Sequence, residues 1–223
     1  MSVGPKLELT ADGSHTLFVS GLDEHYHSVN GAIQESTHVF IEAGLHQVVG
    51  RKINVFEVGF GTGLNAFLTL IDSRLSSKEI HYATIEAYPL AYPIVSKLNY
   101  ADKYGSQAQS LFMKLHESEW EKEIRISPSF FLTKLEADFP TFDFSLIKEP
   151  VDLIYFDAFA PDKQPDMWSQ QLFDQLYNIT AEGGILTTYC AKGAVRRMMQ
   201  QAGYTVERLP GPPGKREMLR AIR

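Results

Sequence analysis

Along most of the chain, short apolar runs alternate with segments in which apolar residues recur at helical spacing. The apolar runs, each typical of a buried strand, lie at 53–58, 80–86, 151–156 and 184–189, and a further strand is expected within 124–136. The helical segments lie at 64–71, 92–98, 109–120, 169–177 and 194–202. Alternation of this kind predicts a parallel sheet covered by helices on both faces, which is a doubly wound, Rossmann-like α/β fold.

The two ends of the chain depart from this alternation. Residues 1–50 predict an N-terminal extension that contains a hairpin and an amphipathic helix over 32–48. We expect the main domain to occupy residues 51–223. At its end, the segments 204–209 and 217–222 are joined by a turn rich in proline and glycine. They predict a hairpin that adds an antiparallel strand to the mostly parallel sheet.

The composition is that of an ordinary globular protein, with 44% hydrophobic residues. No signal peptide is visible at the start and no apolar run is long enough to span a bilayer, so we expect a cytoplasmic protein without a membrane partner. Cys190 is expected to be a packed thiol beside a strand rather than a nucleophile. Because His15, His25 and His27 match no zinc spacing, we expect them in a solvated loop and expect no metal.

Charge is distributed unevenly along the chain, whose formal net charge is −6. From Cys190 onward, eight basic residues stand against two acidic ones. A basic end on an acidic body is expected where one edge of a protein meets phosphate, although a solvated surface has the same composition. The candidate phosphate contacts are Lys163, Arg196, Arg197, Lys215 and Arg216.

A glycine-rich turn follows the first strand of the alternation. This strand ends near Glu57, and glycines follow at Gly59, Gly61 and Gly63. The spacing lets the backbone turn tightly and approach a ligand, and the next helix offers free N–H groups at its start. A P-loop is excluded because no Gly-Lys-Ser/Thr follows. Leu64 in place of glycine or alanine disfavours a nicotinamide or flavin fingerprint.

Acidic residues also stand at the ends of the later units, as Glu86, Asp138 and Asp157. In doubly wound sheets, ligands bind at the carboxyl ends of the strands, and an acid in the position of Glu86 accepts hydrogen bonds from ribose hydroxyls. An exposed helix-capping acid is the alternative interpretation of Glu86. Together with Glu57, these acids at successive strand ends favour a methyltransferase, and the glycine turn resembles motif I of class I methyltransferases.

One methyltransferase family resembles the chain more closely: the tRNA 5-aminomethyl-2-thiouridine methyltransferases, which include the methyltransferase domain of MnmC proteins. The motifs that carry the resemblance span nearly the whole chain, at 26–28, 30–32, 35–36, 56–65, 157–161, 165–168, 187–189, 193–197 and 214–218. The Asp-Ala-Phe-Ala-Pro segment at 157–161 and the Lys-Arg-Glu-Met segment at 215–218 are the most specific of them.

The resemblance implies transfer of a methyl group from S-adenosylmethionine to the amine of 5-aminomethyl-(2-thio)uridine at the wobble position of tRNA. It implies cofactor contacts from Glu57, Gly59, Gly61, Gly63, Asn65, Glu86 and Asp138. Asp157 would be the catalytic residue that faces the amine, as a base or as an orienting group. Fused members of the family carry a flavin-dependent domain that prepares the amine. No such domain is expected here, so a separate enzyme would supply the amine.

The roles of two aromatic residues after Asp157 have two interpretations. Phe159 and Trp168 would either stack on a splayed base of the substrate RNA or seal a helix against the sheet. Other functions also stay open on the same fold: a small-molecule amine N-methyltransferase, an aminopropyltransferase and a non-catalytic RNA-binding module. Salt-sensitive substrate binding would favour RNA over the small molecules, because phosphate contacts release counterions.

Overall fold

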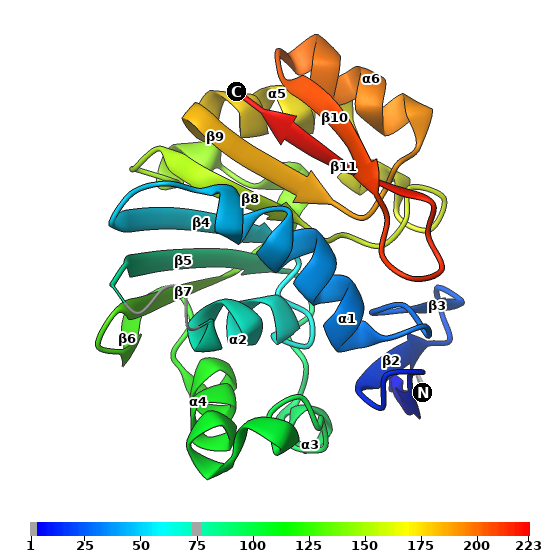
Figure 1. Cartoon of the computed structure of the whole chain (residues 1–223), viewed down its shortest axis with the longest axis vertical. Helices are drawn as coiled ribbons and strands as arrows, with labels where there is room; N and C mark the ends of the chain where they lie inside the picture. Colours follow the sequence, from blue (N-terminus) through cyan, green and yellow to red (C-terminus); the bar gives the residue numbers. More distant parts are fainter. Residues whose placement is uncertain (1–3, 73–76) are drawn as a thin grey trace.

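The computed structural model describes residues 4–72 and 77–223, and this part of the chain forms two β-sheets (Figure 1). The larger sheet has the strand order β10-β11-β9-β8-β4-β5-β7-β6, and the smaller sheet has the order β1-β2-β3. The strands of the larger sheet are β4 (Lys52–Val58), β5 (Glu79–Glu86), β6 (Glu123–Ser127), β7 (Phe130–Glu136), β8 (Val151–Phe156), β9 (Thr180–Thr188), β10 (Thr205–Pro210) and β11 (Glu217–Ile222).

The central strands of the larger sheet run parallel. β4 pairs in parallel with β5 and β8, and the parallel pairing continues to β7 and β9. β11 runs antiparallel to both β9 and β10, so the predicted parallel sheet with an antiparallel C-terminal hairpin is confirmed. The strand expected within 124–136 is β7. The additional antiparallel strand β6 was not predicted, and a turn at Pro128 and Ser129 separates the two.

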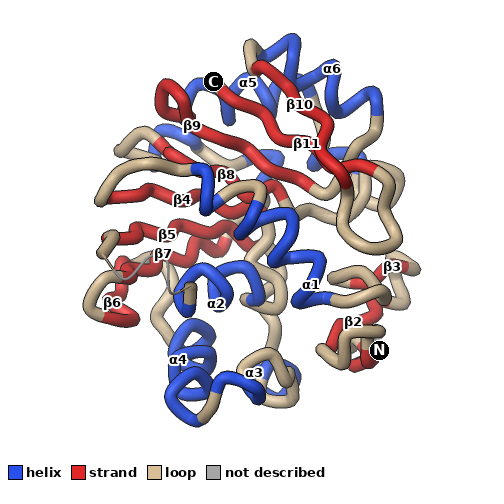
Figure 2. Tube along the Cα trace, in the orientation of Figure 1, coloured by secondary structure: helices blue, strands red, loops and turns tan. Residues whose placement is uncertain are grey.

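Helices cover both faces of this sheet (Figures 1 and 2). One face carries α1 (Ala32–Ser36), α2 (Leu64–Ile71), α3 (Tyr92–Val95) and α4 (Ser106–Glu117), and the other carries α5 (Gln170–Ile179) and α6 (Gly193–Ala202). On β8, Leu153 and Tyr155 pack in the core beneath α2, whereas Ile154 and Phe156 pack in the core beneath α5. Burial on both faces explains why this strand is a continuous apolar run. The doubly wound fold is therefore confirmed.

The N-terminal residues form the smaller sheet and a short helical segment. β1 (Lys6–Leu9) and β2 (His15–Val19) make the predicted hairpin, to which β3 (Glu24–His25) adds a third strand. The prediction of one helix over 32–48 is wrong. α1 continues as a π-helix to Glu42, and Gly44, with φ −107° and ψ −83°, separates it from a short 3-10 helix over Leu45–Gln47. In the described part of the chain, no helix is both long and apolar enough to cross a membrane.

The strand order fixes where a ligand can enter. After β4, the chain builds β5 and β7 on one side and then crosses to β8 on the other side of β4. The connections that leave β4 and β8 therefore diverge at the carboxyl edge of the sheet. This is the topological switch point at which doubly wound proteins bind their ligands.

Candidate active site

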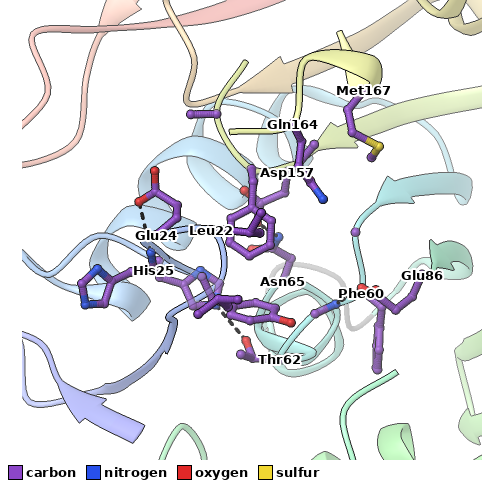
Figure 3. Close-up of a pocket in the computed structure, with 18 of the residues that line it drawn as sticks. Leu22, Glu24, His25, Phe60, Thr62, Asn65, Glu86, Asp157, Gln164 and Met167 are labelled. Carbon is purple, nitrogen blue, oxygen red and sulfur yellow. Dashed lines mark hydrogen bonds between the residues drawn. The ribbon is translucent and has the colours of Figure 1, made fainter. Parts of the chain in front are cut away.

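A cavity of about 760 Å³ opens at the carboxyl ends of β4, β5 and β8 (Figure 3). Its walls come from the N-terminal segment between Val19 and Val29, from the turns that follow these strands, and from the loop before β11. Figure 3 shows Asp157 and Asn65 in the middle of the cavity, with Glu86 toward one side. Cavities of roughly 300–1,000 Å³ hold most cofactors and small ligands.

The glycine turn between β4 and α2 forms one wall. Gly61 and Gly63 have positive φ angles of +49° and +72°. A Cβ on Gly61 would lie 3.0 Å from the Tyr26 ring, and a Cβ on Gly63 would lie 2.8 Å from Nε2 of His116. Both positions therefore require glycine, for conformation and for space. Gly61 and Gly59 line the cavity, and Gly63 lies behind them at the start of α2.

Glu86 is held at the far end of the glycine turn. Its carboxylate accepts hydrogen bonds from the backbone N–H of Gly61 at 2.9 Å and of Tyr88 at 2.8 Å. A carboxylate has about four lone-pair sites, so two bonds orient this one and leave capacity for hydroxyl donors of a ligand. Asp138 lines the same end of the cavity and is exposed. The structure thus brings these two predicted cofactor residues together.

Glu57 lies beneath the cavity rather than in its wall. The side chain is fully buried, and its Oε2 accepts a hydrogen bond of 2.8 Å from the Thr84 hydroxyl. Burial raises the pKa of Glu57 to about 8, and the nearby charge of Asp157 adds to this. Its Oε1 has no hydrogen-bond partner among the described residues. Glu57 therefore supports the glycine turn from below, and the structure gives it no direct access to a ligand.

Asp157 follows β8 and faces the cavity. Its Oδ2 accepts a hydrogen bond of 2.8 Å from Nδ2 of Asn65, which lies in the first turn of α2. Burial raises the pKa of Asp157 to about 7, whereas the hydrogen bond from Asn65 lowers it. Oδ1 of Asn65 is buried and has no partner among the described residues. The pair offers a carboxyl group that exchanges a proton near neutral pH.

The two aromatic residues after Asp157 lie in different surroundings. Phe159 lines the cavity, and its ring meets that of Tyr26 edge to face at 5.1 Å. Trp168 is buried against Phe156, with ring centroids 4.7 Å apart, and its indole N–H donates to the carbonyl oxygen of Phe159 at 2.8 Å. Trp168 therefore seals the segment after β8 against the core. Of the two residues, only Phe159 presents a surface to the cavity.

The five basic residues predicted to contact phosphate also lie in different surroundings. Lys215 lines the cavity. Lys163 lies outside it and donates to the carbonyl oxygen of Asp23 at 2.9 Å. Arg196 and Arg197 lie on α6, and Arg216 is exposed in the loop before β11. The structure therefore places one of these cations at the candidate site, and the other four do not line the cavity.

Sequence reasoning missed the contribution of the N-terminal segment. His27 was expected in a solvated loop, which is wrong, because it is 8% exposed and its Nε2 lies 2.8 Å from the Thr62 hydroxyl. Burial lowers the pKa of His27 to about 4, so the ring is neutral at physiological pH. Tyr26 and Glu35 also line the cavity. Such contacts between distant segments leave no periodic signal, and only the motif resemblance at 26–28 and 35–36 drew attention to these residues.

Cys190 is buried, as predicted, and burial raises the pKa of its thiol. The Ser169 hydroxyl caps α5 by accepting a hydrogen bond from the backbone N–H of Leu172. Among the described residues, no three side chains of the metal-binding types gather in one place.

The doubly wound sheet, the glycine turn and the acids at the strand ends together define a nucleotide-binding α/β enzyme. The chain matches, over residues 107–223, the model of a family described as S-adenosyl-L-methionine-dependent methyltransferases. The chain belongs to this family, and its cofactor is therefore S-adenosylmethionine.

Comparison with individual proteins agrees with this family. The chain is 31% identical over 218 residues to a tRNA 5-methylaminomethyl-2-thiouridine biosynthesis bifunctional protein MnmC from Marinomonas sp. (strain MWYL1), with 88% of this chain and 31% of the relative covered. It is 30% identical to the MnmC protein of Pseudoalteromonas atlantica, with 97% and 33% covered. The chain thus spans about a third of the length of these curated relatives.

Solved structures confirm the fold. The crystal structure of MNMC2 from Aquifex aeolicus superposes with a TM-score of 0.77 at 24% identity, covering 98% of this chain and 70% of that one. Spermidine synthase from Thermotoga maritima superposes with a TM-score of 0.54 at 11% identity, covering 100% and 79%. At such identities the likeness concerns the fold alone.

Proposed function

We propose that the chain transfers a methyl group from S-adenosylmethionine to the primary amine of 5-aminomethyl-(2-thio)uridine at the wobble position of tRNA. The observation that carries this proposal is the partly buried Asp157 carboxyl group, which Asn65 holds beside the glycine turn and whose pKa is raised to about 7. The names of the curated relatives, which concern biosynthesis of 5-methylaminomethyl-2-thiouridine in tRNA, support the same substrate.

The residues on the β4 and β5 side of the cavity fit the cofactor. The turn at Gly59, Gly61 and Gly63 brings bare backbone to the cavity wall, where a Cβ on either of the last two would collide with a neighbour. Glu86 is oriented to accept the ribose hydroxyls, and Asp138 lies where it would accept the exocyclic amine of adenine.

S-adenosylmethionine supplies a methyl group that its sulfonium centre already activates. The protein therefore has to align the amine, exclude water and manage one proton. An amine attacks only in its neutral form, yet it arrives mostly as an ammonium ion. Asp157 binds this ion as a carboxylate and accepts its proton, which a carboxyl group with a pKa of about 7 does readily near neutral pH. Asn65 holds the carboxylate in place.

The basic residues outside the cavity suit a substrate much larger than the cavity. Lys163, Arg196, Arg197 and Arg216 do not line the cavity, and they would contact backbone phosphates of the tRNA. Such contacts position the substrate without reading its sequence. Because tRNA is modified in the cytoplasm of bacteria, we also place the protein there.

The proposal is tested with bulk tRNA from cells that lack this protein. The tRNA is incubated with labelled S-adenosylmethionine and the protein, and its nucleosides are analysed by mass spectrometry. The expected product is a 5-methylaminomethyl uridine. Transfer to small amines but to no tRNA would instead support a small-molecule N-methyltransferase. Binding of tRNA and cofactor without any transfer would support a non-catalytic RNA-binding module.

A further inference from the structure

Lys215 reaches the cavity from the loop that joins β10 to β11. Its ammonium group forms an ion pair with the carboxylate of Glu35, which lies on α1 and is 180 residues away in the sequence. The same nitrogen lies 4.0 Å from the centre of the Tyr189 ring, in the geometry of a cation–π contact. A salt bridge and an aromatic face thus fix this long side chain at one wall of the cavity.

Both partners of Lys215 are themselves held firmly. Glu35 is buried, and its other carboxylate oxygen accepts a hydrogen bond of 2.8 Å from the backbone N–H of Ser28. The Tyr189 hydroxyl donates a hydrogen bond of 2.8 Å to the carbonyl oxygen of Ala158, the residue after Asp157. The position of Lys215 is therefore coupled, through Tyr189, to the segment that carries Asp157.

The strand order separates this group from the residues that fit the cofactor. Gly59, Glu86 and Asp138 lie at the ends of β4, β5 and β7, on one side of Asp157. Tyr189 follows β9, and Lys215 precedes β11, on the other side. Lys215, Glu35 and Tyr189 therefore lie on the side of Asp157 that is left for the methyl acceptor.

The ammonium of Lys215 has a donor to spare. It carries three N–H bonds and no acceptor. Among the described residues, its partners are the Glu35 carboxylate and the Tyr189 ring, which leaves one N–H for the cavity that the side chain lines. Its charge also reaches Asp157. Burial chiefly raises the pKa of Asp157, and the hydrogen bond from Asn65 lowers it. Of the two remaining effects, the charge of Glu35 raises this pKa and that of Lys215 lowers it.

We propose that Lys215 orients the methyl acceptor by donating its remaining N–H to a ring carbonyl oxygen of the acceptor, while Asp157 binds the acceptor's amine. The inference rests on the proposed function. In 5-aminomethyluracil, the C4 carbonyl stands next to the ring carbon that bears the aminomethyl group. The Lys215 ammonium would donate to the C4 carbonyl oxygen and the Asp157 carboxylate would bind the amine, so the two side chains match this pair of groups. The two contacts together select acceptors in which a carbonyl oxygen and an amine flank the same ring bond.

The test compares two synthetic anticodon stem-loop RNAs. One carries 5-aminomethyluridine at the wobble position, and the other carries the 5-aminomethyl-2-pyrimidinone nucleoside, which lacks the C4 oxygen and with it the N3 hydrogen. For the wild-type protein, we expect kcat/KM to be lower on the second RNA by about tenfold to a hundredfold, the usual effect of a lost hydrogen bond to a charged group. The two RNAs also differ in intrinsic reactivity. The test therefore takes the ratio of kcat/KM on the first RNA to kcat/KM on the second, and compares this ratio between the wild-type protein and its variants.

The informative variant is Glu35→Gln/Lys215→Met, which removes both members of the ion pair and leaves no buried charge unpaired. We expect it to lose most of the wild-type preference between the two RNAs and to bind S-adenosylhomocysteine as the wild type does. Lys215→Gln, which still offers Glu35 a donor, is the second variant if the first does not fold, and the same loss is expected. Lys122→Met changes an exposed lysine paired with Glu119, and it should keep the wild-type ratio.

The outcomes separate the two proposals. An unchanged ratio in a folded Lys215 variant overturns the role of Lys215 and leaves the proposed function standing. Failure of the wild-type protein to methylate either RNA, with cofactor bound, overturns the proposed function and the role of Lys215 with it.

Discussion

The side-chain amide of Asn65 donates a hydrogen bond of 2.8 Å to the carboxylate of Asp157, joining the first turn of α2 to the end of β8. These elements are 92 residues apart in the sequence and meet where the strand order changes direction. The bond stabilises the ionised form of a carboxyl group whose pKa burial otherwise raises. It therefore lowers the pH at which Asp157 accepts a proton.

The first prediction concerns the pH dependence of methyl transfer. Because the carboxylate is the active form and its pKa is raised to about 7, kcat/KM should rise with pH up to about 7 and then level off. Asn65→Leu removes the donor that favours the carboxylate, so this rise should shift to higher pH. The measurement is kcat/KM for tRNA at saturating cofactor, between roughly one and a half pH units below the pKa and roughly two units above it. An unshifted profile in Asn65→Leu would contradict the assigned role of the bond.

Glu57 makes a prediction about stability rather than activity. Burial raises its pKa from 4.5 to about 8, so the folded state holds a proton that the unfolded state has released between these values. The free energy of unfolding should therefore fall as pH rises from about 4.5 to about 8. Glu57→Gln removes this group, so its unfolding free energy should fall less over the same range.

Denaturant unfolding at several pH values measures this difference. Glu119→Gln, which changes an exposed carboxylate, is the control and should follow the wild-type curve. If Glu57→Gln and the wild-type protein lose the same stability over this range, the buried carboxyl group is not the source of the dependence.

The glycine turn can be tested with a pair of substitutions matched in backbone conformation. Gly63 and Gly183 have φ angles of +72° and +74°, so alanine meets a similar backbone strain at both. At Gly63 the new Cβ would lie 2.8 Å from the His116 ring, whereas at Gly183 it would meet nothing within 4 Å. Gly63→Ala should therefore weaken cofactor binding by about tenfold or more, the effect of losing roughly 1.4 kcal/mol. Gly183→Ala should leave it unchanged.

Calorimetric titration with S-adenosylhomocysteine checks both variants of this pair. Equal affinities in Gly63→Ala and Gly183→Ala would show that the turn does not hold the cofactor.

The basic residues outside the cavity predict a salt-dependent affinity for tRNA. If Arg197 and Arg216 each contact a phosphate, Arg197→Gln/Arg216→Gln should weaken tRNA binding and reduce the slope of log K against log salt by about 2. Arg51→Gln is the control, because Arg51 is exposed at the opposite end of β4. The measurement is tRNA binding at several salt concentrations, and a slope equal to that of Arg51→Gln would exclude these phosphate contacts.

Features encoded locally could be predicted from the sequence, and those made by distant segments could not. The glycine turn at 59–63 and the acids Glu86 and Asp157 each stand at the end of a strand that the apolar pattern predicts. The structure places all of them at one cavity. The contact of Lys215 with Glu35 joins segments near the two ends of the chain, and no local sequence pattern predicts it. The packing of Trp168 was undecided for the same reason: an aromatic residue after a strand suits a core and a binding site equally well.

The most direct test uses two anticodon stem-loop RNAs that differ only in the aminomethyl group of the wobble uridine. Transfer of labelled methyl from S-adenosylmethionine is followed for the wild-type protein and for Asp157→Asn. We predict transfer to the aminomethyl RNA alone, a loss of about a hundredfold or more in Asp157→Asn, and unchanged cofactor binding in that variant. Equal transfer to both RNAs, or full activity in Asp157→Asn, would contradict a methyltransferase in which Asp157 receives the proton of the acceptor amine.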